Sequence, residues 1–234
     1  MKQRLDQLVV AKGLVPTRSQ AESWIKLGKI TVNGVVVTKP GFFADVSATL
    51  QLHATERYVS RAGLKLASVA AKFGVDFMGK VVLDVGSSTG GFTDYALQHG
   101  ARKVYAVDVG TDQLHPSLRG EKRIELHEKT DIRGFTPEIT PDIVVIDVSF
   151  ISLRQILPHI ASIAGPSTTI YAMVKPQFEA SRQQITSSGV IKNDTIRRTI
   201  LKDFELWAKQ YFIVRAKQDS DIKGARGNAE RFYE

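Results

Sequence analysis

The sequence predicts an α/β protein in which a doubly wound, mostly parallel sheet follows a small α+β module. From about Tyr58 onward, short apolar runs alternate with helical stretches. The runs are continuously apolar, which is typical of strands that helices cover on both faces. Before that point, two short helical patterns precede a hairpin signal. The 234 residues suffice for a small module and a larger domain.

Two short helices are predicted at the start of the chain. Leu5 and Leu8 belong to an apolar stripe at helical spacing over residues 4–11, and Gly13 can end that helix. A second helix follows, and Gly28 is placed to end it.

A hairpin is predicted at Asn33-Gly34, because this dipeptide separates β-branched runs and both turn residues must adopt positive φ. Residues 49–52 can add a strand. Residues 1–53 carry seven basic and three acidic side chains, so about half of the chain's net charge of +8 lies in less than a quarter of its length. This surplus favours a polyanionic partner.

In this order, the two helices, the Gly28-Lys29 turn and the Asn-Gly hairpin resemble the S-four-type (alpha-L motif) RNA-binding domain found in a ribosomal protein and in pseudouridine synthases. The resemblance implies that the helices present basic side chains to the RNA backbone, which recognises shape and phosphate and does not read bases. The residues predicted to contact RNA are Arg4, Arg18, Ser19, Lys26 and Lys29.

The larger domain begins with a helix whose apolar face includes Leu66 and Phe73, and its clearest later helix spans residues 194–210. Six apolar runs are predicted to form its strands: Val81 to Val85, Val104 to Asp108, Ile124 to His127, Ile143 to Asp147, Thr169 to Val174 and Phe212 to Lys217.

Ligands of a doubly wound sheet bind beyond the carboxyl ends of its strands, and the first such end carries a glycine-rich loop over residues 84–92. A Walker loop would need Gly-Lys-Ser/Thr, but Phe92 follows Gly91. The glycine spacing also matches a dinucleotide fingerprint poorly. S-adenosylmethionine fits better, because it has no pyrophosphate to cradle and acidic residues suit its sulfonium and its ribose hydroxyls.

Two carboxylates after the next strands extend this cofactor prediction. Asp108 ends the second strand, where a carboxylate can accept both ribose hydroxyl hydrogens, and Asp131 follows the third strand, near an expected adenine amino group. The residues predicted to bind the cofactor are Asp84, Gly86, Ser88, Thr89, Gly90, Gly91, Phe92, Asp108 and Asp131.

Two further strand ends carry polar groups, at Asp147 and Lys175, and the chain finishes with a polar Gly-Asn-Ala-Glu segment. Five ordered motifs then resemble the TlyA (hemolysin A-like) family over nearly the whole chain: Tyr58–Leu66, Asp84–Phe92, Asp147–Leu153, Val174–Glu179 and Gly227–Glu230. That resemblance implies a Rossmann-like, FtsJ-type methyltransferase domain that uses S-adenosylmethionine to methylate ribose 2′-hydroxyls of ribosomal RNA, with cytidine as the expected nucleotide.

The FtsJ-type pattern of Lys, Asp, Lys and Glu implies the catalytic residues Lys65, Asp147, Lys175 and Glu230. A ribose hydroxyl is a poor acid, so a base must remove its proton as it attacks the methyl group. The hypothesis gives that role to a neutral Lys175. Lys65 would favour the neutral form and the developing alkoxide, while the two carboxylates would orient the reacting groups.

The predicted organisation is an RNA-binding domain over residues 1–53, a linker over residues 54–60 and the methyltransferase domain over residues 61–234. The partners implied are ribosomal RNA and ribosomal subunits. Two other functions stay open: a non-catalytic RNA-binding or ribosome-assembly factor, and a haemolysin, as the family's historical name suggests.

Composition excludes several further classes. The sequence contains no cysteine, so disulfides, thiolate zinc sites and cysteine nucleophiles are absent from it. The five histidines have no metal-ligand spacing, and we expect no metal site. No apolar stretch approaches the roughly 18–20 residues that span a bilayer. The first residues lack the apolar core of a secretory signal, so we expect a cytoplasmic location.

Overall fold

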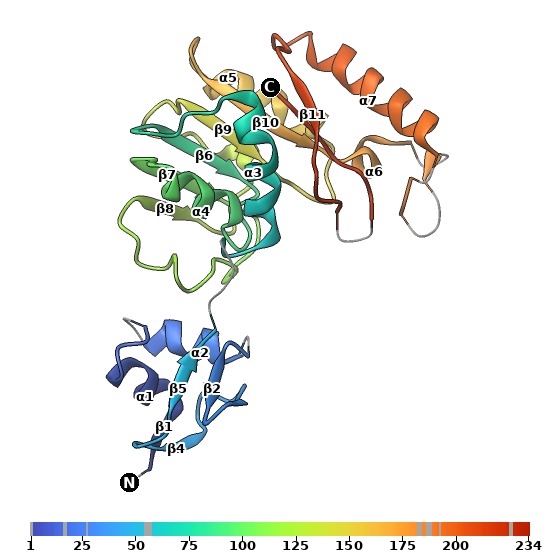
Figure 1. Ribbon diagram of the computed structural model, residues 1–234. Helices are drawn as coiled ribbons and strands as arrows, with labels where there is room; N and C mark the ends of the chain where they lie inside the picture. The colour runs from blue at the N-terminus through green and yellow to red at the C-terminus, as the bar shows by residue number, and fades with distance from the viewer. Residues whose placement is uncertain are drawn as a thin grey trace. The chain divides into compact units, whose positions relative to one another are not determined.

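The computed structural model describes residues 2–15, 18–26, 28–53, 58–181, 184–185, 189–191, 193–224 and 227–234. The chain divides into two compact units, one of residues 1–57 with 115–119 and one of residues 58–114 with 120–234 (Figure 1). The predicted linker over residues 54–60 falls at this division, and its residues 54–57 lie outside the described part.

The smaller unit is an α+β module with a ten-residue apolar core that includes Leu5 and Ile25. Strand β2 pairs antiparallel with β3 and β5, and β1 pairs antiparallel with β4. Its elements are β1 (Lys2–Arg4), α1 (Leu5–Ala11), α2 (Arg18–Lys26), β2 (Ile30–Val32), β3 (Val35–Val36), β4 (Phe43–Asp45) and β5 (Leu50–Leu52).

The predicted turn chemistry of this module is confirmed. Asn33 and Gly34 have φ values of 50° and 80°, as the hairpin turn requires, and Gly13 and Gly28 take φ 69° just beyond their helices. The first helix starts one residue later than predicted, because Arg4 ends β1 opposite Phe43. The polar run Lys2–Arg4 carries no apolar signal for this strand.

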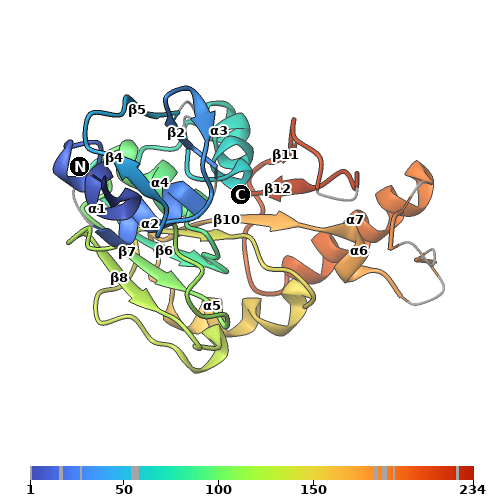
Figure 2. The same cartoon turned by 90° about the horizontal axis from the view of Figure 1, so that it is seen from below.

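The larger unit is built on a seven-stranded sheet, in the order β11-β12-β10-β9-β6-β7-β8. The five strands from β10 to β8 are parallel, and β12 runs antiparallel between β10 and β11. Figure 2 shows these strands from below. The strands are β6 (Val81–Val85), β7 (Lys103–Val107), β8 (Ile124–His127), β9 (Ile143–Ile146), β10 (Thr169–Val174), β11 (Lys217–Asp219) and β12 (Arg231–Tyr233).

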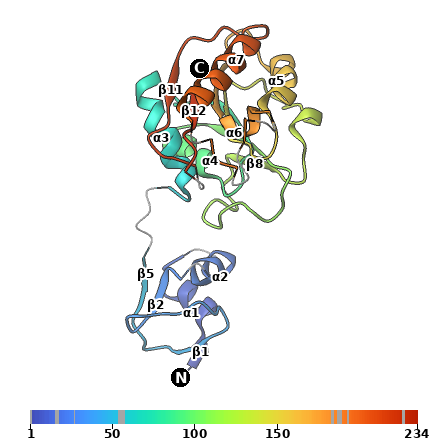
Figure 3. The same ribbon diagram turned by 90° about the vertical axis from the view of Figure 1, so that its right-hand side faces the viewer.

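Helices cover both faces of this sheet, which confirms the doubly wound architecture. Figures 1 and 3 show α3 and α4 on one face and α5 on the other. Residues of α5 and α7 share a core cluster with alternate residues of the central strands. The helices are α3 (Arg61–Phe73), α4 (Gly91–Gln98), α5 (Leu157–Ile163), α6 (Pro176–Glu179) and α7 (Asp194–Ala208), with short 3₁₀ turns η1 (Ile132–Gly134) and η2 (Leu153–Gln155).

One predicted strand is wrong. The run Phe212 to Lys217 was expected to be a strand, but β11 begins only at Lys217. The ladder pairs Lys217 with Tyr233, and backbone hydrogen bonds continue it to Glu234 through Arg215 and Ala216, so residues 212–214 lie past the paired segment. Phe212 packs against the core without strand pairing, while Ile213 is exposed. Apolar content alone therefore mimicked a strand in a segment that covers the core edge.

Candidate active site

The carboxyl ends of the parallel strands meet at one edge of the sheet, and the predicted site residues follow them. Register places Val85 of β6 beside Val107 of β7 and Ile146 of β9. Gly86, Asp108 and Asp147 come next along these three strands. The fold therefore gathers the glycine-rich loop and two of the predicted carboxylates at this edge.

Asp84 is the most deeply buried of these groups, with 1% of the residue exposed. It lies in β6 on the face covered by α4, and its Oδ2 accepts a 2.6 Å hydrogen bond from the Thr93 hydroxyl. Its Oδ1 has no hydrogen-bond partner in the described part of the chain. Burial, reinforced by the nearby charge of Asp147, outweighs the Thr93 hydrogen bond and raises the pKa of Asp84 to about 7.

The loop after β6 brings backbone close to its neighbours. Gly86 has φ 80°, and a Cβ there would lie 2.8 Å from the Asp147 carbonyl oxygen. Ser88 also has positive φ, and its N–H donates to Asp108 Oδ2 at 2.8 Å. Asp108 Oδ1 accepts from the Gly110 N–H at 2.7 Å. The loop and the carboxylate after β7 are therefore one hydrogen-bonded unit.

The other predicted cofactor residues differ in position. Gly90 caps α4 with φ 88°, while Thr89 is exposed. Phe92 points into the core, with its ring centroid 6.0 Å from that of Phe232. The Asp131 carboxylate accepts hydrogen bonds from the guanidinium of Arg133, the shortest at 2.6 Å, and from the Arg133 N–H. These hydrogen bonds lower the pKa of Asp131 to about 2. In the described contacts, the Asp131 side chain therefore caps the start of η1.

The four residues implied by the FtsJ-type pattern form two ion pairs. Lys175 Nζ lies 2.6 Å from Asp147 Oδ1 and donates to Ser149 Oγ at 2.9 Å. Lys65 Nζ donates to Glu230 Oε2 at 2.6 Å. All four side chains are largely buried, so neither pair is strongly screened by solvent.

Strand direction explains how Glu230 reaches this edge. β12 runs antiparallel to β10, with Arg231 opposite Val174. Glu230 precedes Arg231 and Lys175 follows Val174, so the same register carries both side chains just beyond the carboxyl end of β10. A residue near the chain's end thereby joins residues from α3 and from the strand ends.

A cavity of about 600 Å³ opens between these groups. Its lining includes both lysines and one carboxylate of the pairs, together with two aromatic side chains: Lys65, Lys175, Glu230, Ser149, Phe150 and Phe178. A second cavity, of about 520 Å³, lies at the opposite end of β10 and is lined by none of the predicted site residues.

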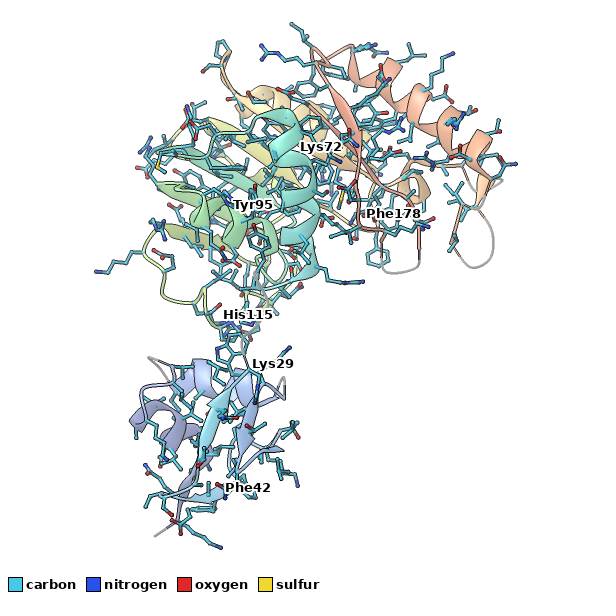
Figure 4. The ribbon with its side chains drawn as sticks, in the orientation of Figure 1. Lys29, Phe42, Lys72, Tyr95, His115 and Phe178 are labelled. Carbon is cyan, nitrogen blue, oxygen red and sulfur yellow. The ribbon has the colours of Figure 1, made fainter. Side chains whose placement is uncertain are left out.

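Phe150 has the most unusual position of the lining residues. It is 89% exposed and has φ 66°, a conformation that costs a non-glycine residue about 1–3 kcal/mol. Its ring centroid lies 5.4 Å from that of Phe178, which Figure 4 labels on α6. An apolar residue after a strand gave no signal for this exposure, so the sequence did not assign Phe150 a role.

Two buried polar residues hold the segments around the cavity. Glu179 accepts hydrogen bonds from Ser152 Oγ at 2.6 Å and from the Leu153 N–H at 2.8 Å, and burial raises its pKa. It thus ties the segment after β10 to the segment after β9. Asn228 accepts from the Ile191 N–H at 3.0 Å and so holds the wall of the cavity beside Glu230. Both residues belong to the sequence motifs, but no role was predicted for them.

In the smaller unit, two of the predicted RNA-contacting residues come together. Arg4 and Arg18 both contact the carboxylate of Asp6. Lys29 lies in the turn before β2. The side chains of Ser19 and Lys26 lie outside the described part of the chain.

Comparison with known proteins matches residues 58–233 to the FtsJ-like methyltransferase family and residues 3–50 to the S4 domain. Over 98% of its length the chain is 37% identical to the 16S/23S rRNA (cytidine-2'-O)-methyltransferase TlyA of Mycobacterium tuberculosis, covering 88% of that protein. It is 38% identical to Hemolysin A of Brachyspira hyodysenteriae, with 97% of each chain covered. A solved structure from Streptococcus thermophilus matches with TM-score 0.74 and 41% identity, over 99% of this chain and 87% of that one.

The fold, the loop at the carboxyl ends and these matches define a Rossmann-like methyltransferase domain joined to an S4 domain. The resemblance predicted from the five motifs is confirmed. The chain belongs to the FtsJ-like methyltransferase family.

Neither a membrane-spanning helix nor a metal cluster is present in the part of the chain that the structure describes. In that part of the chain, no helix has the length and apolar character to span a bilayer. The same residues contain no group of three or more His, Cys, Asp or Glu side chains that could hold a metal ion.

Proposed function

We propose that this chain transfers a methyl group from S-adenosylmethionine to a ribose 2′-hydroxyl of ribosomal RNA, with cytidine as the nucleotide. The observation that carries the proposal is the pair of buried ion pairs, Lys175–Asp147 and Lys65–Glu230, beside one cavity at the carboxyl edge of the sheet. The relative from Mycobacterium tuberculosis, named for this reaction on 16S and 23S rRNA, supports the choice of substrate.

The loop after β6 fits S-adenosylmethionine. Within the described part of the chain, one buried carboxylate oxygen of Asp84 has no hydrogen-bond partner, and Gly86 lets the loop backbone lie directly against the Asp147 carbonyl. Asp108 sits beside the loop, at the distance of a hydrogen bond from Ser88. In the proposal, Asp84 and Asp108 face the cation and the ribose hydroxyls. The cofactor, when bound, supplies a methyl group activated by a sulfonium.

Within the cavity, Lys175 is proposed to act in its neutral form: after releasing its own proton to solvent, it takes the proton from the attacking ribose hydroxyl. Asp147 and Ser149 hold its nitrogen by contacts of 2.6 and 2.9 Å, so the base is fixed in position before the substrate arrives. Lys65, held by Glu230, lines the same cavity and is proposed to supply the positive charge that stabilises the developing alkoxide.

The cavity mouth supports an RNA substrate. Phe150 exposes an aromatic face there, and stacking on aromatic side chains is how proteins hold single, unstacked bases. A ribose can enter the cavity only if its nucleotide leaves the helical stack. In the proposal, the S4 domain binds the RNA backbone, and Phe150 holds the target nucleotide.

The test is transfer of labelled methyl from S-adenosylmethionine to separated small and large ribosomal subunits that lack the modification. Alkaline digestion follows, because a 2′-O-methyl group blocks strand cleavage at its nucleotide. The expected product is an alkali-resistant labelled dinucleotide, absent when Lys175→Ala replaces the parent protein. Label that is alkali-sensitive would contradict ribose methylation. Demonstrated cofactor binding with no label in either subunit would contradict the assignment of assembled subunits as substrate, and RNA binding without cofactor binding would favour a non-catalytic factor.

A further inference from the structure

The structure places a buried carboxylate beneath the two arginines of the S4 domain. Asp6 is fully buried, and its Oδ2 accepts hydrogen bonds from Arg4 Nη2 at 2.9 Å and from Arg18 Nε at 2.8 Å. Its Oδ1 accepts from Arg4 Nε at 3.1 Å. One carboxylate therefore fixes two guanidinium groups that come from different elements.

The position of Asp6 is itself fixed by the backbone. Its N–H donates to the carbonyl of Pro40 at 3.1 Å, and the Leu5 N–H donates to the carbonyl of Phe42 at 2.7 Å. Figure 4 labels Phe42 in the smaller unit. The Arg4 guanidinium lies over Gly41, where a Cβ would be 3.3 Å from Nη1. Side chain and backbone together give the arginine pair a rigid base.

The arginines remain open to a ligand. Arg4 and Arg18 have exposed side-chain fractions of 38% and 52%. The contacts described for Arg18, to Asp6 and to Glu22, both use Nε, so in the described part of the chain its two terminal nitrogens remain available as donors. Asp6 and Glu22 together balance the two guanidinium charges, so a phosphate is recognised here by the exposed N–H donors of the arginines and not by a surplus of positive charge.

We infer that Asp6 is a positioning residue that holds Arg4 and Arg18 as a preformed clamp for an RNA backbone phosphate. A purely stabilising role explains it poorly, since burying a charge is costly and an apolar residue often serves stability better. Fixing two long side chains before binding removes much of the ordering cost that flexible arginines incur on the RNA. The inference rests on the proposed function only in taking RNA as the partner.

The direction in which Asp6→Asn changes RNA affinity distinguishes this inference from a general electrostatic effect. Asp6→Asn removes a negative charge, so a general field effect would tighten RNA binding. Loss of the clamp instead weakens binding, by about tenfold for two side chains that must be ordered again. The matched control is Asp45→Asn, which makes the same charge change at an exposed site that contacts neither arginine.

The experiment measures fluorescence anisotropy of a labelled stem–loop RNA with the full chain between 50 and 200 mM KCl, and thermal unfolding checks each variant. We expect Asp6→Asn to bind the RNA about tenfold more weakly. The slope of log affinity against log salt concentration should decrease by about one, as for the loss of one phosphate contact. Asp45→Asn should bind as the parent does or slightly more tightly. In an Arg4→Ala, Arg18→Ala background, Asp6→Asn should cause no further loss.

Arg18→Lys provides an independent test if Asp6→Asn does not fold, because it keeps the charge on an exposed side chain and removes the Nε donor. It should also weaken binding. Unchanged or tighter RNA binding by a folded Asp6→Asn protein would overturn the role of Asp6. So would an equal loss of affinity when Asp6→Asn is made in the Arg4→Ala, Arg18→Ala background. If Asp6→Asn does not fold, unchanged RNA binding by Arg18→Lys would overturn it. A parent protein that does not bind the stem–loop would refute RNA as the partner and this inference together.

Discussion

Replacing Asp84 with asparagine should remove a pH-dependent component of the protein's stability. In the folded chain the pKa of Asp84 is raised to about 7 by burial and by the charge of Asp147, against 3.8 for an ordinary aspartate. The folded state therefore holds this proton more tightly than the unfolded state does. A raised carboxyl pKa contributes stability that is fully present below the unfolded value and is lost as the pH rises through the folded value.

The size of the effect follows from the two pKa values of Asp84. Each pKa unit corresponds to about 1.4 kcal/mol, so a difference of about three units corresponds to roughly 4 kcal/mol lost between pH 4 and pH 7. Asparagine keeps the shape of the protonated acid and carries no proton that titrates in this range. The free energy of unfolding of Asp84→Asn, relative to the parent, should therefore rise by roughly this amount over the same interval.

Urea unfolding of parent and variant at half-unit steps from pH 4 to pH 8 measures this difference directly, because all other titrating groups cancel in the comparison. Asp203→Asn, at an exposed site on α7, is the matched control for loss of one carboxylate. A difference between Asp84→Asn and the parent that does not change with pH would refute the argument that burial raises the pKa of this carboxyl.

Three further substitutions test the site. Lys175→Ala should lower kcat by about 10²–10⁴ while leaving S-adenosylmethionine affinity unchanged in equilibrium binding, and near-normal turnover would contradict its role as base. Glu179→Gln should lower kcat by up to about a hundredfold and raise KM by less, because the segment that carries Lys175 loosens. An unchanged kcat would show that Glu179 does not position the site. Gly91→Ala would bring a Cβ within 2.8 Å of Ala62 and Gly63, so α3 and α4 must separate. Thermal unfolding should show a loss of about 1–3 kcal/mol, and no loss would mean that the helices tolerate the separation.

The strands that the sequence predicted well are apolar runs bounded by polar residues or glycine, whether they lie inside the sheet or, like β8, at its edge. The bounds of β6, β8 and β10 match the predicted runs to the residue, and the Asn33-Gly34 turn was fixed by local chemistry. Failures occurred where pairing, not composition, decides. Phe212 to Lys217 is apolar enough for a strand, but its hydrogen bonds to the end of the chain begin only at Arg215. Strand β4 shows no clear alternation, and its pairing with β1 is a tertiary property.

In the candidate site, too, the sequence predicts which residues take part, while strand pairing decides which of them meet. The resemblance to the FtsJ-type pattern predicts Lys65, Asp147, Lys175 and Glu230 as a set, but it does not say which lysine contacts which carboxylate. Lys65 and Glu230 are 165 positions apart, and their contact depends on the direction of the three-residue strand β12.

A short strand gives no sequence signal for its direction, because side chains alternate in the same way whichever way it runs. Had β12 been parallel to β10, Glu230 would lie at the amino edge of the sheet, one strand length from Lys175. The antiparallel register opposite Val174 places it instead beside Lys175 and within 2.6 Å of Lys65 Nζ. Each lysine thus has its own carboxylate. Removing either carboxylate would leave a buried charge uncompensated, so the two pairs must be maintained together for the cavity to keep its form.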